Sequence, residues 1–294
     1  MRVQGFDIIT ESVVGEGVAR VVDTVHVATG KHFVSKLIPL TTENPRTCYE
    51  QFFNEVHMLR HLNSTPNTHV VSIESSFVSG NTAVIVLEKM EGDLLDLILE
   101  ERLSPFQKAH VFHQICVALQ FCHQRGVAHL DIKPENILCD ALGSSIRLAD
   151  FGTSGEMQDG LVSAAHGTLQ YNPPEVLMGG TSLRGEAVDV WSLGMLLHVL
   201  LTGTWPFNAN DPEAIRSLLS KGKLTLSADL QKEEVKLLSH MLQVDPDRRA
   251  SLETILASEY LRPFTAEDPP QPLARRTKPR SRLLHWLSKT NRVE

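Results

Sequence analysis

The segment 129–136, which reads His-Leu-Asp-Ile-Lys-Pro-Glu-Asn, restricts the fold and chemistry of this chain more sharply than any other stretch. It places an acid, a lysine and an amide close together, and a second acid begins the later tripeptide Asp150-Phe151-Gly152. Either stretch alone is weak evidence, because an acid in a loop often caps a turn. Their order and spacing together predict that two loops converge on one polar site.

These segments resemble the catalytic loop (H-R-D-x-x-x-x-N) and the D-F-G motif of eukaryotic protein kinases. The resemblance implies that Asp131 accepts and orients a substrate hydroxyl, and that Lys133 contacts the γ-phosphate of ATP. It also implies that Asn136 and Asp150 bind Mg²⁺, which prefers hard oxygen donors. ATP and Mg²⁺ are therefore the expected cofactors, and transfer of phosphate to serine or threonine of proteins is the expected reaction.

A lysine and a glutamate earlier in the chain complete the phosphate contacts that the resemblance implies. Lys36 ends the run Phe-Val-Ser-Lys, which resembles the family's V-A-I-K, and would bind the α- and β-phosphates. Glu55 lies in a run with helical spacing and is the expected ion-pair partner of Lys36. The alternative for Glu55 is an ordinary solvated helix residue.

The segment 15–22 resembles the family's glycine-rich loop only in part. Gly15 and Gly17 let the backbone approach phosphate, but Ala19 and Arg20 replace the aromatic tip and the third glycine. By resemblance, Leu87 is the gatekeeper behind the adenine. The full set expected around ATP is Gly15, Glu16, Gly17, Val22, Val34, Lys36, Glu55, Leu87, the backbone of Glu88 and Met90, and Leu138.

Three further matches concern the support of the site. Thr168, after Gly167, resembles the threonine that contacts the catalytic acid and lysine in serine/threonine kinases, and it argues against a tyrosine kinase. Glu175 resembles the glutamate of A-P-E, which pairs with an arginine at the position of Arg249. Asp189 resembles the helix acid that holds the catalytic-loop backbone.

Leu130 stands where the family's H-R-D motif has arginine. In many members that arginine binds a phosphorylated residue of the activation segment, here residues 150–175, through charge-assisted hydrogen bonds. Leucine cannot do so, and the segment contains no lysine or arginine. Activity is therefore expected not to require phosphorylation there, at Thr153, Ser154 or Ser163.

A second interpretation is a pseudokinase that binds nucleotide or partner proteins without efficient catalysis. Val34 replaces the alanine against the adenine ring, and its extra methyls crowd the pocket. Ala19 and Arg20 add to this case. Against it, Lys36, Asp131 and Asp150 are all present, so an active enzyme is favoured.

Two acids bear on the choice of substrate. Asp93 and Glu135 fall where kinases that prefer basic substrates keep acids that bind arginine upstream of the acceptor. The alternatives are a helix N-terminal acid for Asp93 and a solvated loop acid for Glu135. The formal net charge is −7 although residues 271–294 hold seven Lys/Arg and one acid, so the rest of the chain is strongly acidic. That charge favours cationic partners and disfavours nucleic acid.

The order of elements predicts an α+β, bilobal protein kinase fold. Residues 1–92 are expected to form a small lobe of five antiparallel strands and one helix (48–62), with 93–262 as a larger, mainly helical lobe. The resemblance runs from about residue 6 to residue 261 and is nearest to the calcium/calmodulin-dependent kinase group. The apolar run 188–201 is expected to be a core helix, too short to cross a bilayer, which takes about 20 residues.

Residues 263–294 are expected to be a proline-rich linker followed by a basic, amphipathic tail. In 275–289, cations precede and flank Leu283, Leu284, Trp286 and Leu287. This composition fits a calmodulin target, an autoinhibitory contact with the acidic body, a nuclear import signal, a membrane-surface segment or an unstructured tail. No signal peptide is apparent, so a cytoplasmic location, with a nuclear alternative, is expected.

Overall fold

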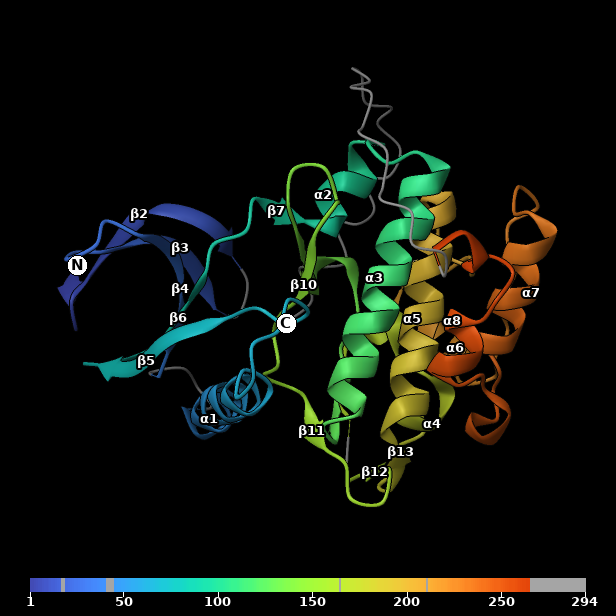
Figure 1. The fold of residues 1–294 in the computed structure, drawn as a ribbon. Helices are drawn as coiled ribbons and strands as arrows, with labels where there is room; N and C mark the ends of the chain where they lie inside the picture. The colour runs from blue at the N-terminus through green and yellow to red at the C-terminus, as the bar shows by residue number, and fades with distance from the viewer. Residues whose placement is uncertain (17–18, 41–44, 164, 210, 265–294) are drawn as a thin grey trace.

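The structure is a computed structural model, and it describes residues 1–16, 19–40, 45–163, 165–209 and 211–264. Within these residues the chain forms a sheet-containing lobe at one end and a larger helical lobe at the other (Figure 1). This is the bilobal α+β architecture that the sequence predicts. The expected tail and the expected Gly17 contact lie outside the described residues.

The small lobe is built on one antiparallel sheet with strand order β1-β2-β3-β4-β6-β5. The two-residue β1 precedes the five expected strands, so the sheet has six strands and not five. Alternating β-branched residues and glycine turns explain the longer strands. The bounds are β1 (Arg2–Val3), β2 (Phe6–Glu16), β3 (Arg20–His26), β4 (His32–Pro39), β5 (Ile73–Ser79) and β6 (Thr82–Glu88).

Helix α1 (Pro45–Leu62) packs against the inner face of this sheet and belongs to the main core through Phe52, Val56 and Leu59. The outer face has its own small core, which includes Phe6, Ile8, Val22, Phe33, Val84 and Val86. The inner face instead joins the helices of the larger lobe in one continuous core. Side chains on the inner face therefore point toward the junction between the lobes.

The larger lobe is organised around α5 (Gly185–Thr202), which is buried along most of its length. Ser104 begins α3 (Pro105–His123) with a capping box to Gln107, and Gly203, at φ 67°, ends α5. The remaining helices are α2 (Leu94–Leu99), α4 (Pro174–Leu177), α6 (Pro212–Leu219), α7 (Lys232–Met241) and α8 (Leu252–Leu256).

Short elements that the sequence analysis did not anticipate carry the loops of this lobe. The strands are β7 (Gly92–Asp93), β8 (Val127–Ala128), β9 (Ile137–Cys139), β10 (Ile146–Leu148), β11 (Gly155–Glu156), β12 (Leu161–Val162) and β13 (Leu183–Arg184). The 3-10 turns are η1 (Pro134–Asn136), η2 (Leu169–Tyr171), η3 (Pro246–Arg248) and η4 (Arg262–Phe264). Pairing of β11 with β8 and of β12 with β13 fixes the activation segment to the lobe.

The expected core helix is present as α5, which is longer than the run 188–201 to which the length argument against a membrane span applied. The helix has 18 residues and is apolar enough to cross a membrane by length and composition. However, 78% of it is buried inside the protein, where it contacts α3 and α7. Its apolar residues therefore serve as the core of the larger lobe.

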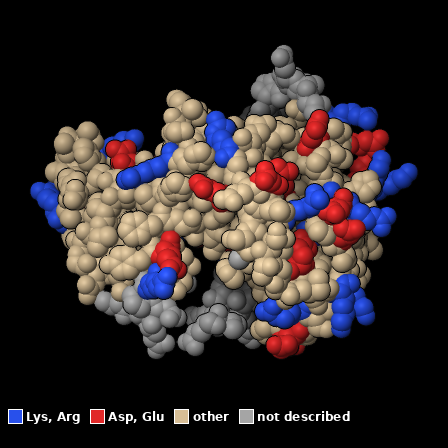
Figure 2. Space-filling model, turned by 90° about the horizontal axis from the view of Figure 1, so that it is seen from below, with Lys and Arg blue, Asp and Glu red and all other residues tan. Residues whose placement is uncertain are grey.

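Charged side chains of both signs are interspersed on the face shown in Figure 2, most densely over the larger lobe. Neither sign forms a continuous patch on this face. On this face the acidic residues are therefore dispersed among basic ones. Local groups of acids should attract a charged partner more than the net charge of the chain does.

Candidate active site

Three charged groups from distant parts of the chain meet where the lobes join. Lys36 Nζ, on β4, lies 2.8 Å from Glu55 Oε2 of α1 and 2.8 Å from Asp150 Oδ1. The predicted Lys36–Glu55 ion pair is therefore present, and Glu55 is a buried residue and not a solvated one. The lysine is held between both carboxylates at the inner face of the sheet.

Burial and mutual attraction compete in this triad. Burial raises the pKa of Glu55, and the nearby charge of Lys36 only partly opposes this. Burial also works against ionisation of Asp150, but the charge and hydrogen bond of Lys36 hold the pKa of Asp150 below its ordinary value. Likewise, burial disfavours the ammonium of Lys36, while the two acids raise its pKa. The lysine is therefore positively charged at neutral pH.

Asp131 is fixed by neighbours on three sides. Its Oδ1 accepts hydrogen bonds of 2.8 Å from both the amide and the hydroxyl of Thr168. Its Oδ2 lies 2.8 Å from Lys133 Nζ and accepts from Asn136 Nδ2 at 3.1 Å. Lys133 also donates to the Thr168 hydroxyl at 2.8 Å. The side chains of Asp131, Lys133, Asn136 and Thr168 therefore form one network.

The backbone before Asp131 is strained, and Asp189 supports it. Leu130 has a φ of 66°, a left-handed conformation that costs a residue with a side chain about 1–2 kcal/mol. The buried carboxylate of Asp189 accepts from the amides of His129 (2.8 Å) and Leu130 (2.7 Å). It also lies 2.8 Å from His123 Nε2, a contact that the sequence analysis missed. These bonds stabilise the turn that presents Asp131.

Asn54 is a second residue that the sequence analysis missed. Its Nδ2 donates to the backbone oxygens of Phe151 (3.3 Å), Gly152 (3.1 Å) and Ser154 (2.8 Å). The adjacent Asp150 has a φ of 61°, so the loop is strained where Asn54 binds it. Asn54 precedes Glu55 in α1, and one helical turn therefore holds both Lys36 and the Asp150 loop.

Two oxygen donors remain available for a metal ion. Asn136 donates through Nδ2 to the carbonyl and carboxylate of Asp131, and no hydrogen bond of the described residues uses its Oδ1. Asp150 engages Lys36 through Oδ1, and its side chain is 46% exposed. Mg²⁺ prefers such hard oxygen ligands and keeps several waters, so Asn136 and Asp150 fit this ion.

A sequence model of the protein kinase domain matches residues 8–261, which include every group described above. The chain belongs to the protein kinase family. It is 31% identical over 261 residues to "Sucrose non-fermenting protein kinase 1" of Fusarium virguliforme, covering 87% of this chain and 36% of that protein.

Other relatives of this kinase agree with that assignment. It is 37% identical to "NUAK family SNF1-like kinase 2" of Rattus norvegicus, over 68% of this chain and 31% of that protein. It is 35% identical to "Carbon catabolite-derepressing protein kinase" of Secale cereale, over 70% of this chain and 41% of that protein. The chain thus spans about a third to two fifths of the length of these curated relatives.

The strand register of the kinase corrects one nucleotide contact. Val22 belongs to the outer core of the sheet and pairs with Ser35, so it faces away from Lys36. Val21 pairs directly with Lys36 and packs against the main core. Directly paired residues share a face, so Val21 and not Val22 lines the lobe junction. The pairing of β3 with β4 is regular here, so the motif spacing placed this contact one residue too late.

Other expected nucleotide contacts of the kinase lie along the same inner face. Val34 pairs with Leu87, and both are buried in the main core, to which Leu138 is adjacent. The amide of Glu88 already donates to the Ser72 carbonyl at 2.9 Å, so only its carbonyl remains for a ligand. Met90 follows β6 and is partly buried. Gly15 lies in the last turn-proximal part of β2, which ends at Glu16. For Glu16 the structure describes only the backbone.

The kinase fills the position of the missing arginine with an apolar cluster. Leu130 is 1% exposed and packs with Val162 and Ala165 of the activation segment and with Leu183 and Val188. Ser154, one of the three expected phosphorylation positions, is buried and donates to the His129 carbonyl at 3.1 Å. It is therefore inaccessible for modification, whereas Ser163 is exposed.

The ion pair predicted to brace the larger lobe of the kinase is present. Arg249 makes two parallel hydrogen bonds to Glu175, of 2.8 and 3.1 Å, and its side chain has no exposed area. It also donates to the carbonyl of Gln243. The end of the activation segment is therefore fixed to the base of the lobe.

Glu135 lies close enough to Asp93 to affect the pKa of Asp93. Asp93 is the N-cap of α2 and accepts from the amide of Asp96 at 3.0 Å. Burial, together with the charges of Asp96 and Glu135, raises the pKa of Asp93 to about 6 although backbone hydrogen bonds oppose this. The Oε2 atom of Glu135 is buried and has no partner among the described residues. The pair is therefore an under-neutralised acidic site.

Proposed function

We propose that this protein catalyses transfer of the γ-phosphoryl group of ATP to serine and threonine hydroxyls of proteins. The observation that carries this is the fixed position of Asp131 among Lys133, Thr168 and Asn136. Phosphoryl transfer depends on positioning and on neutralising charge more than on covalent chemistry by the protein. Each group needed for these tasks is present in the described part of the chain.

The side chains divide the work by position. Asp131 would accept the hydrogen bond of the acceptor hydroxyl and aim its oxygen, while Lys133 holds that carboxylate and faces the transferred group. Lys36, oriented by Glu55, would bind the α- and β-phosphates of the substrate ATP. Asn136 and Asp150 would hold Mg²⁺, which supplies charge neutralisation when bound. Thr168 ties the activation segment to Asp131 and supports serine/threonine over tyrosine acceptors.

We also propose that activity does not depend on phosphorylation of the activation segment. The Leu130 cluster, the β11–β8 and β12–β13 pairs, and the three bonds of Asn54 already order this segment without a phosphate. In the test, the purified protein is treated with a phosphatase and then assayed, alongside the variants Thr153→Ala and Ser163→Ala. The rates should stay within twofold of the untreated wild type. A large loss in any arm would contradict the proposal.

Substrates with arginine or lysine two or three residues before the acceptor are the proposed class. The unpartnered Oε2 of Glu135 and the raised pKa of Asp93 support a cationic ligand, because a guanidinium would neutralise both acids. A peptide library should show this preference, and Glu135→Gln should weaken it. Selection of acidic or proline-directed peptides would rule it out.

The pseudokinase alternative is separated by a labelling experiment. Wild-type protein with Mg²⁺ and radiolabelled ATP should label a basic protein substrate, whereas Lys36→Met and Asp150→Asn should not. Lys31→Met and Asp159→Asn are matched controls, since both residues are exposed, and they should retain activity. If wild type labels nothing but ATP still raises its melting temperature, the alternative is correct.

We propose calmodulin as a partner of residues 275–289, in line with the resemblance to the calcium/calmodulin-dependent group. The support is a run of cations followed by a cluster of leucines and a tryptophan in this segment. Deleting residues 270–294 and assaying with and without Ca²⁺–calmodulin tests this. Stimulation of wild type alone supports calmodulin, whereas a calmodulin-independent rise on deletion supports autoinhibition. No change in either assay rules out both.

A further inference from the structure

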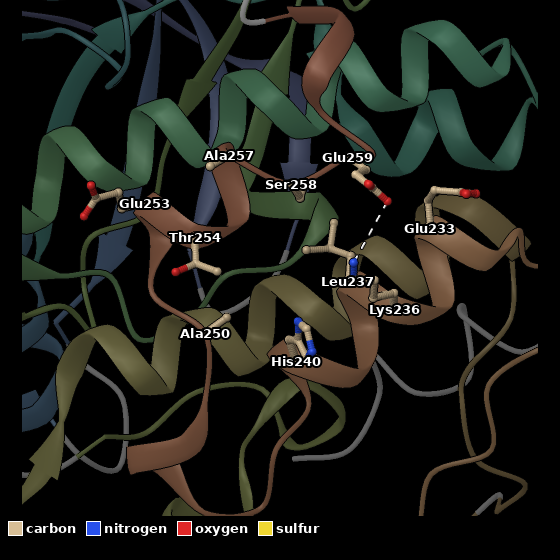
Figure 3. A pocket seen from close by; sticks show the side chains of 10 residues that line it. All are labelled: Glu233, Lys236, Leu237, His240, Ala250, Glu253, Thr254, Ala257, Ser258 and Glu259. Atoms are coloured by element: carbon tan, nitrogen blue, oxygen red, sulfur yellow. Dashed lines mark ion pairs between the residues drawn. The ribbon is translucent and has the colours of Figure 1, made fainter.

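A groove lies on the larger lobe between α7 and the segment 250–259, which contains α8 (Figure 3). Its volume is about 500 Å³, and Leu237, Ala250 and Ala257 form its apolar lining. Pockets of roughly 300–1,000 Å³ accommodate drug-sized groups, so one or two large side chains fit. The groove is thus large enough to receive an aromatic or aliphatic residue of another segment.

The rim of this groove is acidic. Glu233 lies on the α7 side, and Glu253 and Glu259 lie on the other. Glu259 is 4.0 Å from Lys236 and 3.6 Å from Arg262, but Glu233 and Glu253 have no cationic partner among the described residues. Two carboxylates therefore remain to pair with a cationic ligand beside an apolar floor.

Residues 275–289 of the same chain have the complementary chemistry. They contain six Lys/Arg and no acid, with Leu283, Leu284, Trp286 and Leu287 as apolar anchors. Cations match the free acids of the rim, and the apolar residues match its floor. Tryptophan and arginine are also the residues that most often anchor interfaces.

The described chain ends close to this groove. Phe264 is held on α3 by Phe106, with ring centroids 5.0 Å apart, and it follows Glu259 by only a few residues. Residues 265–274 then separate Phe264 from Arg275, a length that spans at most about 35 Å when extended. A tether of this length gives an effective concentration in the millimolar range, which favours even a weak intramolecular contact.

We propose that residues 275–289 dock in the groove between α7 and α8, with an apolar side chain on Leu237 and Ala257 and cations on Glu233 and Glu253. α7 lies at the end of the larger lobe remote from the sheet, so this contact leaves Asp131 uncovered (Figure 1). Docking would instead hide the cations and leucines that calmodulin or an anionic membrane would bind. The groove therefore competes with such partners for the tail.

Site-specific cross-linking in the full-length protein tests this inference. In the double variant Ala257→Cys/Leu287→Cys, a short bismaleimide should link the two introduced cysteines within one chain, so the product runs as a monomer. The four native cysteines are buried and should not compete for the reagent. Met178→Cys with Leu287→Cys is the control, since Met178 is 67% exposed and outside the groove. It should give several-fold less product.

Charge reversal then checks the recognition chemistry. Glu233→Lys with Glu253→Lys, added to the Ala257→Cys/Leu287→Cys protein, should lower the yield several-fold without a change in melting temperature. A product between two chains only would mean that a second copy occupies the groove, and equal yields at positions 257 and 178 would mean random contact. Either result, or no cross-link at all, would overturn the proposal whether or not calmodulin binds.

Discussion

Leu130 and Val162 lie on either side of Gly155, where a Cβ atom would come within 3.3 Å of Leu130 and 3.1 Å of Val162. Both side chains belong to one buried apolar cluster that joins the catalytic loop to the activation segment. Where the family's arginine would bind a phosphate, the kinase thus has an apolar contact between the catalytic loop and the activation segment. A Cβ at position 155 would force these two side chains to shift by a few tenths of an ångström, so the glycine favours the close approach of the two elements.

Restoring the arginine at position 130 should therefore damage the protein. Leu130→Arg places a guanidinium among the apolar side chains of Val162, Ala165 and Leu183, and an uncompensated buried charge costs about 3–5 kcal/mol. Urea unfolding should show this loss, and activity should fall with it. Leu130→Met preserves the volume and should cost less than about 1.5 kcal/mol. An arginine variant as stable as the methionine variant would refute the role given to this cluster.

Among the ion pairs described in the larger lobe, loss of the one made by Arg249 should lower the free energy of unfolding most. Arg249→Met leaves Glu175 without its two bonds, and breaking a buried pair costs about 3–5 kcal/mol. Arg46→Met is the matched control, because Arg46 is 91% exposed and its pair with Glu50 is worth at most about 0.5 kcal/mol. Denaturant midpoints at neutral pH measure both, and equal midpoints would contradict the prediction.

Much of this site could be predicted because motif spacing reports residues that the fold brings together. Lys36, Glu55 and Asp150 are far apart in sequence yet meet at 2.8 Å, and the pattern of one lysine, one helix acid and one loop acid identified them. The same holds for Glu175 and Arg249. These contacts depend on side-chain chemistry, which the sequence records directly.

Contacts that depend on backbone geometry could not be predicted. Val22 was expected in the nucleotide site, but the register between β3 and β4 pairs Val21, and not Val22, with Lys36. Because side chains alternate across a strand, one residue of error reverses the face. Asn54 binds three backbone carbonyls. Every residue has such a carbonyl, so residue types do not show which ones a side chain will bind. Such interactions appear only when the chain is folded.

The pKa of Asp93 predicts a pH-dependent effect on stability. This pKa is about 6 in the folded protein, above the ordinary value of 3.8, so the folded protein binds the proton more tightly than the unfolded chain. The stability gained from this proton is therefore fully present below about pH 3.8 and is lost as the pH rises through 6. Asp93→Asn keeps an N-cap side chain but carries no charge. The variant should be more stable than wild type at pH 8, and the difference should vanish as pH falls from 6 to 4.

Thermal unfolding of both proteins across this pH range measures the effect. Asp211→Asn is the control for the change of cap chemistry, because Asp211 is also a helix N-cap but is exposed. A constant difference between wild type and Asp93→Asn at all pH values would show that the Asp93 carboxyl titrates normally.

Gly167 should tolerate no side chain, because it lies where the activation segment crosses the catalytic loop. A Cβ there would be 2.5 Å from the Leu130 carbonyl and 2.7 Å from Asn172 Oδ1, so Gly167→Ala must displace the backbone next to Thr168. Since Thr168 holds Asp131 through two hydrogen bonds, kcat should fall by more than tenfold while the melting temperature changes less. Gly92→Ala meets only Asp96 at 3.4 Å and should keep near-normal kcat. Equal kcat values for the two variants would show that catalysis does not depend on this crossing.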